Sequence, residues 1–251
     1  MRHDAVTPAA RFVLAHGFTQ TARSWSTIEP LLAERIPGAE LVAIDLPGHG
    51  DSTVPADADL WTAADHLVRA GGVATYVGYS MGGRVALHAA MARPDEVRAL
   101  VLIGATAGID TADERAARRA ADERLAEHVQ QVGVGTFIDE WLRNALFAGL
   151  TDATAQRDDR LRNTPGGLAA SLRSTGSGTQ EPLWERLGEV TCPVLVLVGE
   201  HDEKFTTLGR RLCAGLPDAT MTVIADAGHS VHLEQPVATA DAIASWHRTR
   251  V

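Results

Sequence analysis

The pentapeptide Gly-Tyr-Ser-Met-Gly at residues 78–82 constrains the fold of this chain more than any other stretch. It follows the apolar run at residues 73–77 and precedes a segment of good helix formers that begins at Arg84. A serine flanked in this way by two glycines, between a strand and a helix, is typical of a tight turn that presents a nucleophile. Glycine suits both positions because the serine backbone is strained and its neighbours leave little space. The sequence therefore predicts a catalytic role for Ser80.

Short apolar runs alternate with helix-forming segments on both sides of this turn. The strand-like runs are at residues 12–15, 41–45, 73–77, 97–103, 194–198 and 219–224. The helices expected between and after them include residues 24–35 and 207–216. Such alternation predicts an α/β fold with a mainly parallel sheet, right-handed crossovers and flanking helices. We therefore expect the catalytic residues at the carboxyl ends of the strands.

Residues 105–178 interrupt the alternation, because they contain helix-like patterns and no strand-like run. A structured insertion of this length between two strands usually covers the active site. We therefore expect a helical cap at residues 105–178, inserted after the strand that ends near Ile103, and a core made of residues 1–104 and 179–251. Substrate specificity is expected in the cap.

A serine hydroxyl needs an imidazole to take its proton and a carboxylate to orient that imidazole. Asp202 follows the apolar run at residues 194–198, and His229 follows the last predicted strand. The order serine, acid, histidine is typical of one large class of enzymes with a catalytic triad. We therefore predict a triad of Ser80, Asp202 and His229. Other candidates are Glu200 and Glu203 for the acid, and His16, His49 and His232 for the base.

Acyl-transfer chemistry also needs backbone N–H groups that stabilise a developing oxyanion. One is expected from the residue after the serine, Met81, and the other from the loop after the first strand, where Phe18 stands. The glycine- and proline-containing stretch at residues 45–50 is expected to shape a neighbouring loop and is given no chemical role.

Composition narrows the range of partners. A net charge of −9, with no basic run interleaved with aromatic residues, disfavours binding to nucleic acid or to an acidic membrane surface. A small anionic substrate would need arginines concentrated at the site. Cys192 and Cys213 lack the spacing of metal ligands, and no phosphate-binding glycine loop occurs, so no metal or organic cofactor is expected.

The N-terminal residues 1–8 lack the apolar core of a signal sequence, and no apolar run approaches the roughly 20 residues of a membrane span. These patterns predict a cytoplasmic protein with free thiols and no insertion into a membrane.

The core motifs resemble the α/β-hydrolase superfamily over essentially the whole chain. Finer features resemble one family within it, the 2-succinyl-6-hydroxy-2,4-cyclohexadiene-1-carboxylate (SHCHC) synthases of menaquinone (vitamin K2) biosynthesis. The matching stretches are residues 45–50, 78–86, 114–122, 147–150, 161–162, 167–172, 199–205 and 228–232. The stretches within the cap are the more diagnostic, because generic hydrolases share the serine turn but not the cap.

The resemblance implies a carbon–oxygen lyase that removes a ring proton and expels pyruvate from a small substrate with several carboxylates. Ser80, activated by His229, would be the base, and the oxyanion hole would stabilise an enolate-like oxygen. By family position, the substrate-binding residues are Arg84, Arg118 and Arg162, with Tyr79, Trp141 and Lys204 as pocket neighbours. No cofactor is implied.

Simpler interpretations of the arginines remain. Arg118 lies four residues from both Glu114 and Asp122, so an exposed helix with salt bridges explains it without a ligand. Arg84 could pair with a nearby carboxylate, although a cation near a helix N-terminus is electrostatically disfavoured. Arg162 could be a surface residue.

Two other functions also fit the sequence. A serine hydrolase of small esters, lactones or carbon–carbon bonds would share the triad and the oxyanion hole. A non-catalytic ligand receptor on the same scaffold is the second, and the intact triad argues against it. Dehalogenase and epoxide hydrolase chemistry is disfavoured because both need a carboxylate where this chain has Ser80.

Overall fold

The computed structural model describes residues 10–55 and 58–251, and the N-terminal segment considered above for a signal sequence lies outside them. Its sheet has six strands in the order β2-β1-β3-β4-β5-β6, and every neighbouring pair is parallel. The strands are β1 (Arg11–Ala15), β2 (Glu40–Ile44), β3 (Ala74–Tyr79), β4 (Val97–Ile103), β5 (Val194–Gly199) and β6 (Ala219–Ile224). The predicted α/β class with a parallel sheet flanked by helices is confirmed.

Strand β1 lies between the edge strand β2 and β3, so the chain adds β2 on one side of β1 and then β3, β4, β5 and β6 in turn on the other. Ala15 at the end of β1 pairs with Gly78 near the end of β3. The loop that follows β1 and the turn that follows β3 therefore lie next to each other at the carboxyl edge, where ligands bind in open parallel sheets.

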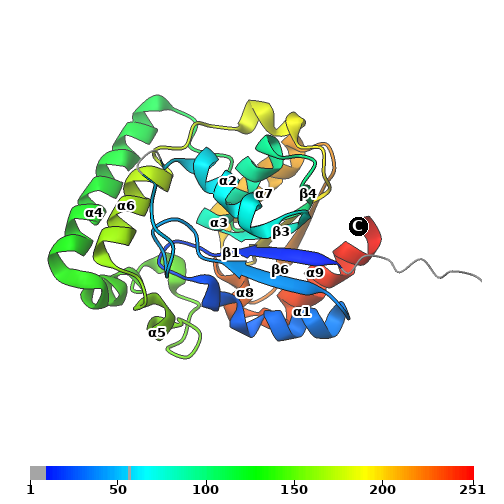
Figure 1. Cartoon of the computed structure of the whole chain (residues 1–251), viewed down its shortest axis with the longest axis horizontal. Coiled ribbons are helices and arrows are strands. Elements are labelled where there is room, and N and C mark those ends of the chain that lie inside the picture. The colour runs from blue at the N-terminus through cyan, green and yellow to red at the C-terminus, as the bar shows by residue number, and fades with distance from the viewer. Residues whose placement is uncertain (1–9, 56–57) are drawn as a thin grey trace, which may run out of the picture.

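Helices cover both faces of the sheet (Figure 1). One face packs against α2 (Leu60–Gly71), α3 (Met81–Ala92), η3 (Trp184–Glu189) and α7 (Glu203–Gly215). The other packs against η1 (Ala22–Thr27), α1 (Glu29–Arg35), α8 (Val231–Glu234) and α9 (Pro236–Arg250). Alternate side chains of a strand point to opposite faces of the sheet. In β1, Val13 packs in the apolar core on the face covered by α2 and α3, and Phe12 packs in the core on the face covered by α1 and α9.

Between β4 and β5 the chain forms α4 (Ala112–Trp141), η2 (Ala145–Phe147), α5 (Arg157–Arg160) and α6 (Pro165–Thr175). We call residues 105–178 the cap, and their division from the core as a separate unit stays a prediction. Helices α4 and α6 lie side by side at the end of the molecule opposite α9 (Figure 1) and enclose an apolar core of their own. Gly133, with φ of 79° and ψ of 166°, kinks α4 where the sequence pattern changes.

Two helices differ from the sequence expectation. The single helix expected from Ser24 to Arg35 is divided into η1 and α1, and Pro30, which has no N–H to donate, lies in the first turn of α1. The helix expected from residue 207 begins at Glu203, because the Asp202 carboxylate accepts a hydrogen bond from the Phe205 N–H and caps the helix. Among the described helices, none has the length and apolar character to cross a bilayer.

Candidate active site

Ser80 occupies a strained turn between β3 and α3. Its φ of 51° and ψ of −105° lie in a region that residues with a side chain rarely adopt. A Cβ atom at Gly78 would collide with the Gly82 carbonyl, and one at Gly82 would collide with the Ala15 carbonyl of β1. The two glycines thus let the turn pack against the end of β1 and hold Ser80 partly exposed.

The structure brings Ser80, His229 and Asp202 into one line of hydrogen bonds. His229 Nε2 lies 3.2 Å from Ser80 Oγ, and His229 Nδ1 lies 2.7 Å from Asp202 Oδ2. The imidazole and the carboxylate are both buried. With Nδ1 donating to the carboxylate, Nε2 is free to accept the serine proton, which is the arrangement that makes serine a nucleophile or a base.

The competing acids and bases lie elsewhere. Glu200 is exposed, and its Oε2 accepts the Asp226 N–H at 3.1 Å. Glu203 is exposed at the start of α7. His16 and His49 are buried and hydrogen-bonded to loops, so they stabilise the neighbourhood of the site without contacting Ser80.

The loop that carries Phe18 is held by these two buried histidines. His16 Nε2 accepts the Leu46 N–H at 3.0 Å, and His49 Nε2 accepts the Thr19 N–H at 3.3 Å. Burial lowers the pKa of both imidazoles, which keeps them neutral and able to accept at Nε2. The stretch at residues 45–50 therefore stabilises the loop expected to supply an oxyanion donor.

Phe18 and Met81, the two expected oxyanion donors, follow neighbouring strands at the carboxyl edge of the sheet, and their role stays a prediction. Met81 is the first residue of α3, so its N–H has no carbonyl partner earlier in the helix. Phe18 follows β1, beside the turn that carries Ser80. The Phe18 ring packs edge-on against Trp141 of α4, with ring centroids 5.2 Å apart. The Trp141 indole Nε1 is buried and has no hydrogen-bond partner among the described residues.

Arg84 and Arg118 approach each other between α3 and the cap. Arg84 is 8% exposed, and its Nη1 is buried without a partner in the described chain. Burial, with the nearby Arg118 cation, lowers the pKa of Arg84 to about 10. Arg118 Nε donates to Asp122 Oδ1 at 2.8 Å, while 41% of the Arg118 side chain stays exposed. The i,i+4 salt bridge forms, and Arg118 nevertheless remains accessible to a ligand.

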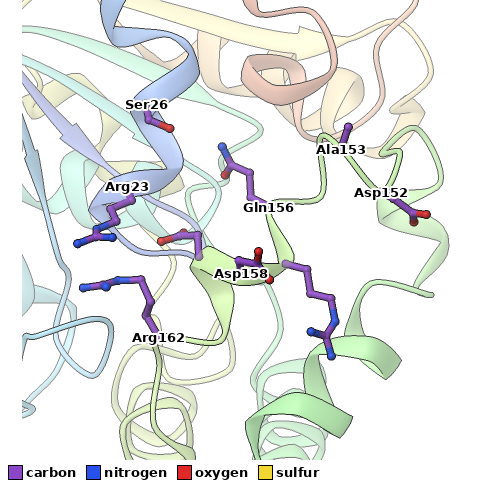
Figure 2. Close-up of a pocket in the computed structure, with 9 residues that line it drawn as sticks. Arg23, Ser26, Asp152, Ala153, Gln156, Asp158 and Arg162 are labelled. Carbon is purple, nitrogen blue, oxygen red and sulfur yellow. The ribbon is translucent and has the colours of Figure 1, made fainter.

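Arg162 is placed in a different part of the surface. Its Nη2 lies 3.8 Å from Asp51 Oδ2, and it lines a cavity of about 670 Å³ near the Arg23 guanidinium (Figure 2). The other lining residues are Ser26, Asp152, Ala153, Gln156, Arg157, Asp158 and Asp159. No member of the predicted triad lines this cavity. The role of Arg162 as a substrate ligand therefore stays a prediction that the geometry does not favour.

Arg160, which sequence reasoning missed, is the buried arginine of this segment. It is 1% exposed, donates from Nε to the Ala155 carbonyl at 2.8 Å and from Nη1 to the Thr19 hydroxyl, and leaves Nη2 without a described partner. Burial lowers the pKa of its guanidinium, and the nearby Tyr79 opposes this shift. The one available signal was a second arginine two residues before Arg162; which of the two is buried depends on packing.

Tyr79, the residue before Ser80, is buried and shares a 2.7 Å hydrogen bond with the Ser230 hydroxyl. Its ring packs against His232, with centroids 4.3 Å apart. Burial lowers the pKa of His232 to about 3, so this histidine in α8 is neutral. His232 therefore contributes packing beside Tyr79.

Lys204 is exposed, and its Nζ lies 5.5 Å from the centre of the Phe205 ring. That ring packs against His229 at a centroid distance of 4.3 Å. Lys204 is thus at the exposed margin near the triad histidine.

One candidate group of metal ligands occurs within the described residues. Glu200, His201 and Asp226 have ligand atoms within 4.8 Å of one another, and all three are exposed. Cys192 and Cys213 are free, and burial raises the pKa of the Cys192 thiol to about 11, which disfavours the thiolate that binds metals. None of these groups includes a triad residue.

The model of the alpha/beta hydrolase family matches residues 12–242. The chain belongs to the α/β-hydrolase family. Within it, this hydrolase-fold chain is 34% identical over 243 residues to the 2-succinyl-6-hydroxy-2,4-cyclohexadiene-1-carboxylate synthase of Salmonella agona (strain SL483), covering 94% of this chain and 93% of the relative. A Bacillus subtilis (strain 168) protein, which carries the same name with a provisional qualifier, is 35% identical over 237 residues, covering 89% of this chain and 85% of the relative. The resemblance to this family seen in the sequence is confirmed.

Solved structures agree with this assignment. MenH from S. aureus superposes with a TM-score of 0.89 at 28% identity, covering 98% of this hydrolase-fold chain and 96% of the other. A thermophilic esterase from Thermogutta terrifontis superposes with a TM-score of 0.81 at 27% identity, covering 96% of this chain and 90% of the esterase. The scaffold is therefore shared by proteins named for different reactions, and the activity must be argued from the site.

Proposed function

We propose that this chain is an SHCHC synthase, a carbon–oxygen lyase of menaquinone biosynthesis that eliminates pyruvate from a small substrate with several carboxylates. The names of its relatives support this assignment, and so does the buried Arg84 in the helix that follows Ser80, with Arg118 of the cap nearby. Location in the cytoplasm remains a prediction from the sequence.

The observation that carries the proposal is the buried Arg84 guanidinium, one turn after Ser80, whose Nη1 has no hydrogen-bond partner among residues 10–55 and 58–251. Leaving a buried cation without a full set of partners is costly, and the cost is higher near the positive end of a helix. A substrate carboxylate would supply the missing acceptor in a charge-assisted bond. Hydrolysis of a neutral ester would not require a buried guanidinium in the helix that follows the nucleophile.

In the proposed reaction, His229 Nε2 takes the proton of the Ser80 hydroxyl, and the Ser80 oxygen removes a proton from a ring carbon of the substrate. The electron pair left on the ring forms a carbon–carbon double bond as the carbon–oxygen bond to the leaving group breaks. The leaving group departs as the enolate of pyruvate and is then protonated. Asp202 keeps the imidazole in the required tautomer.

Negative charge that develops on the substrate carbonyl during proton removal would be stabilised by the N–H groups of Phe18 and Met81. Arg84 and Arg118 would hold one carboxylate between α3 and the cap. Arg160, which lies beside Tyr79, is better placed than Arg162 to meet a second one. Trp141 and Lys204 would line the remaining wall and margin.

A serine hydrolase of small esters, lactones or carbon–carbon bonds is the second candidate. It is favoured by the likeness to the Thermogutta terrifontis esterase and by the triad, which serves both chemistries. The two candidates differ in what the arginines do, because hydrolysis of a neutral ester would not depend on them.

The deciding experiment follows pyruvate release from the enzymatically generated carboxylated precursor, beside hydrolysis of a short-chain aryl ester. Pyruvate release that disappears in Ser80→Ala, with poor ester hydrolysis, is the expected result. Ester turnover without pyruvate would make the chain a hydrolase, and turnover of neither compound would favour a non-catalytic ligand receptor.

A further inference from the structure

The side chain of Met81 makes a contact that the catalytic scheme does not use. Met81 is 4% exposed, and its Sδ lies 3.6 Å from Ser171 Oγ and 3.7 Å from Thr175 Oγ1. Both hydroxyls are buried and lie one turn apart on α6 of the cap. A thioether is a weak acceptor, so two hydroxyls on one sulfur are an unusual use of buried polar groups.

The hydrogen atoms of this group can be accounted for. Ser171 Oγ lies 3.1 Å from Thr175 Oγ1, and Thr175 Oγ1 lies 3.0 Å from the Ser171 carbonyl. Two hydroxyl hydrogens are therefore shared among the Ser171 carbonyl, the two hydroxyl oxygens and the sulfur. Met81 receives one hydrogen if Ser171 donates to the sulfur and Thr175 to the carbonyl, or if Ser171 donates to Thr175 and Thr175 to the sulfur. If Ser171 donates to Thr175 and Thr175 to the carbonyl, the sulfur receives none, so fixing Met81 through a hydrogen bond requires one of the first two arrangements.

The other expected oxyanion donor also contacts the cap. The Phe18 ring packs against Trp141 and, with centroids 6.4 Å apart, against Phe137, and it touches the apolar core between α4 and α6. Both residues whose N–H groups would form the oxyanion hole are thus held by cap side chains, although their backbones belong to the core.

We infer that Ser171 and Thr175 are positioning residues that fix Met81, so that the oxyanion hole has its working geometry only when α6 is seated on the turn after β3. This inference rests on the proposed catalytic role of Ser80. The physical reason is that the Met81 N–H lies in the peptide joined to Ser80 at the free start of α3. Anchoring the Met81 side chain limits the rotation of that peptide, and preorganised donors stabilise charge better than mobile ones.

The contact itself can be tested without turnover. The chain has four methionines, so protein labelled with ¹³C at the methionine methyl groups has few NMR signals, and Met81→Leu identifies the one from Met81. Ser171→Ala and Thr175→Val should shift this signal. Ser174→Ala, which removes a neighbouring α6 hydroxyl that has no hydrogen-bond partner in the described part of the chain, should not shift it. An unmoved Met81 signal in both hydroxyl variants would overturn the inference.

The link to the oxyanion hole is tested by the rate at which a fluorophosphonate modifies Ser80. The Ser80 oxygen forms a bond to phosphorus, fluoride leaves, His229 takes the hydroxyl proton, and the phosphoryl oxygen occupies the oxyanion hole. Ser171→Ala should slow labelling roughly two- to tenfold, the range expected for one modest hydrogen bond. Thr175→Ser should retain the wild-type rate because it keeps the hydroxyl, and Ser174→Ala should also retain it.

A double-mutant cycle distinguishes positioning from general loss of packing. If the hydroxyls act through the sulfur, Ser171→Ala should slow labelling no further once Met81→Leu is present. Additive effects, or wild-type Ser80 that does not react at all, would overturn the inference. Because the probe is not the natural substrate, absence of pyruvate release with a coupled cycle would contradict the proposed lyase and leave the positioning role supported.

Discussion

The Nε2 atom of His229 lies 3.2 Å from the Oγ atom of Ser80, although 149 positions separate the two residues in the chain. On the opposite edge of the same ring, Nδ1 is hydrogen-bonded to the Asp202 carboxylate. Asp202 therefore orients the imidazole, and Nε2 accepts the proton of Ser80. This geometry sets the direction of proton transfer, and the first prediction follows from it.

Asp202→Asn should lower kcat by about 10³- to 10⁴-fold, because an amide facing Nδ1 favours the tautomer protonated at Nε2, which cannot accept the serine proton. Steady-state pyruvate release measures the effect, and circular dichroism checks the fold. Glu203→Gln, at the exposed neighbouring acid, is the matched control and should retain activity. A variant of Asp202 with more than a tenth of the wild-type rate would contradict the assigned role.

Arg118→Ala should raise KM for the carboxylated substrate about tenfold or more and change kcat less, because the lost interaction is a charge-assisted bond to a group that does not react. The comparison is with Arg124→Ala, at an exposed arginine of the same helix. Hydrolysis of a neutral aryl ester by either variant should be unaffected. Unchanged kinetics in Arg118→Ala would disprove the anion pocket.

Arg160 and Arg162 provide a matched pair of substitutions. Arg160→Gln should lower kcat/KM about tenfold or more, since it removes a buried cation near Tyr79 whose Nη2 has no partner within the described residues. Arg162→Gln should stay within about twofold of wild type, because a weak, exposed ion pair contributes little. The reverse result would place the second carboxylate at Arg162 and its surface cavity.

Stability should fall as the solution becomes mildly acidic. His88 is buried, its Nδ1 donates to the Arg84 carbonyl at 2.7 Å, and burial lowers its pKa from 6.5 to about 4. In the unfolded chain the His88 imidazole therefore binds a proton near pH 6.5, whereas in the folded protein it binds this proton only near pH 4. The stabilisation is complete above pH 6.5 and declines below it, by up to about 1.4 kcal/mol per pH unit for each such histidine.

Urea unfolding at pH 7, 6 and 5 measures this dependence, because most carboxylates remain ionised over that range. His88→Gln keeps a donor and removes the titrating group, so its free energy of unfolding should fall less steeply with acid. Equal slopes for the two proteins would show that His88 is not buried in its neutral form.

Much of the fold could be read from the sequence because its signals are local. Each strand is a short apolar run ended by glycine or polar residues, and the glycines around Ser80 reflect a backbone conformation imposed by the adjoining strand and helix. The order of serine, acid and histidine along the chain follows from the strands that carry them. The sequence does not predict the division of the helix near Pro30 or the early start of α7 at Glu203, because these depend on single caps and turns.

The arginines show where local reasoning ends. Arg160 and Arg162 have the same chemistry and nearly the same neighbours in sequence, yet one is enclosed by Thr19 and Ala155 and the other faces solvent. Similarly, the spacing of Arg118 and Asp122 predicts their ion pair but not that Arg84 lies close to them from another helix. Burial depends on segments far apart in the chain, and no short pattern encodes it.

The sequence by itself determined the α/β class, the serine turn and the small set of candidates for the acid and the base, because each depends on a periodicity or a backbone conformation that a few adjacent residues impose. The tertiary structure alone decided which arginine is buried, which oxygen each N–H meets, and that cap hydroxyls contact the Met81 sulfur. Those features arise where cap and core meet, and the energy of a buried charge or hydrogen bond is set by neighbours that only folding brings together.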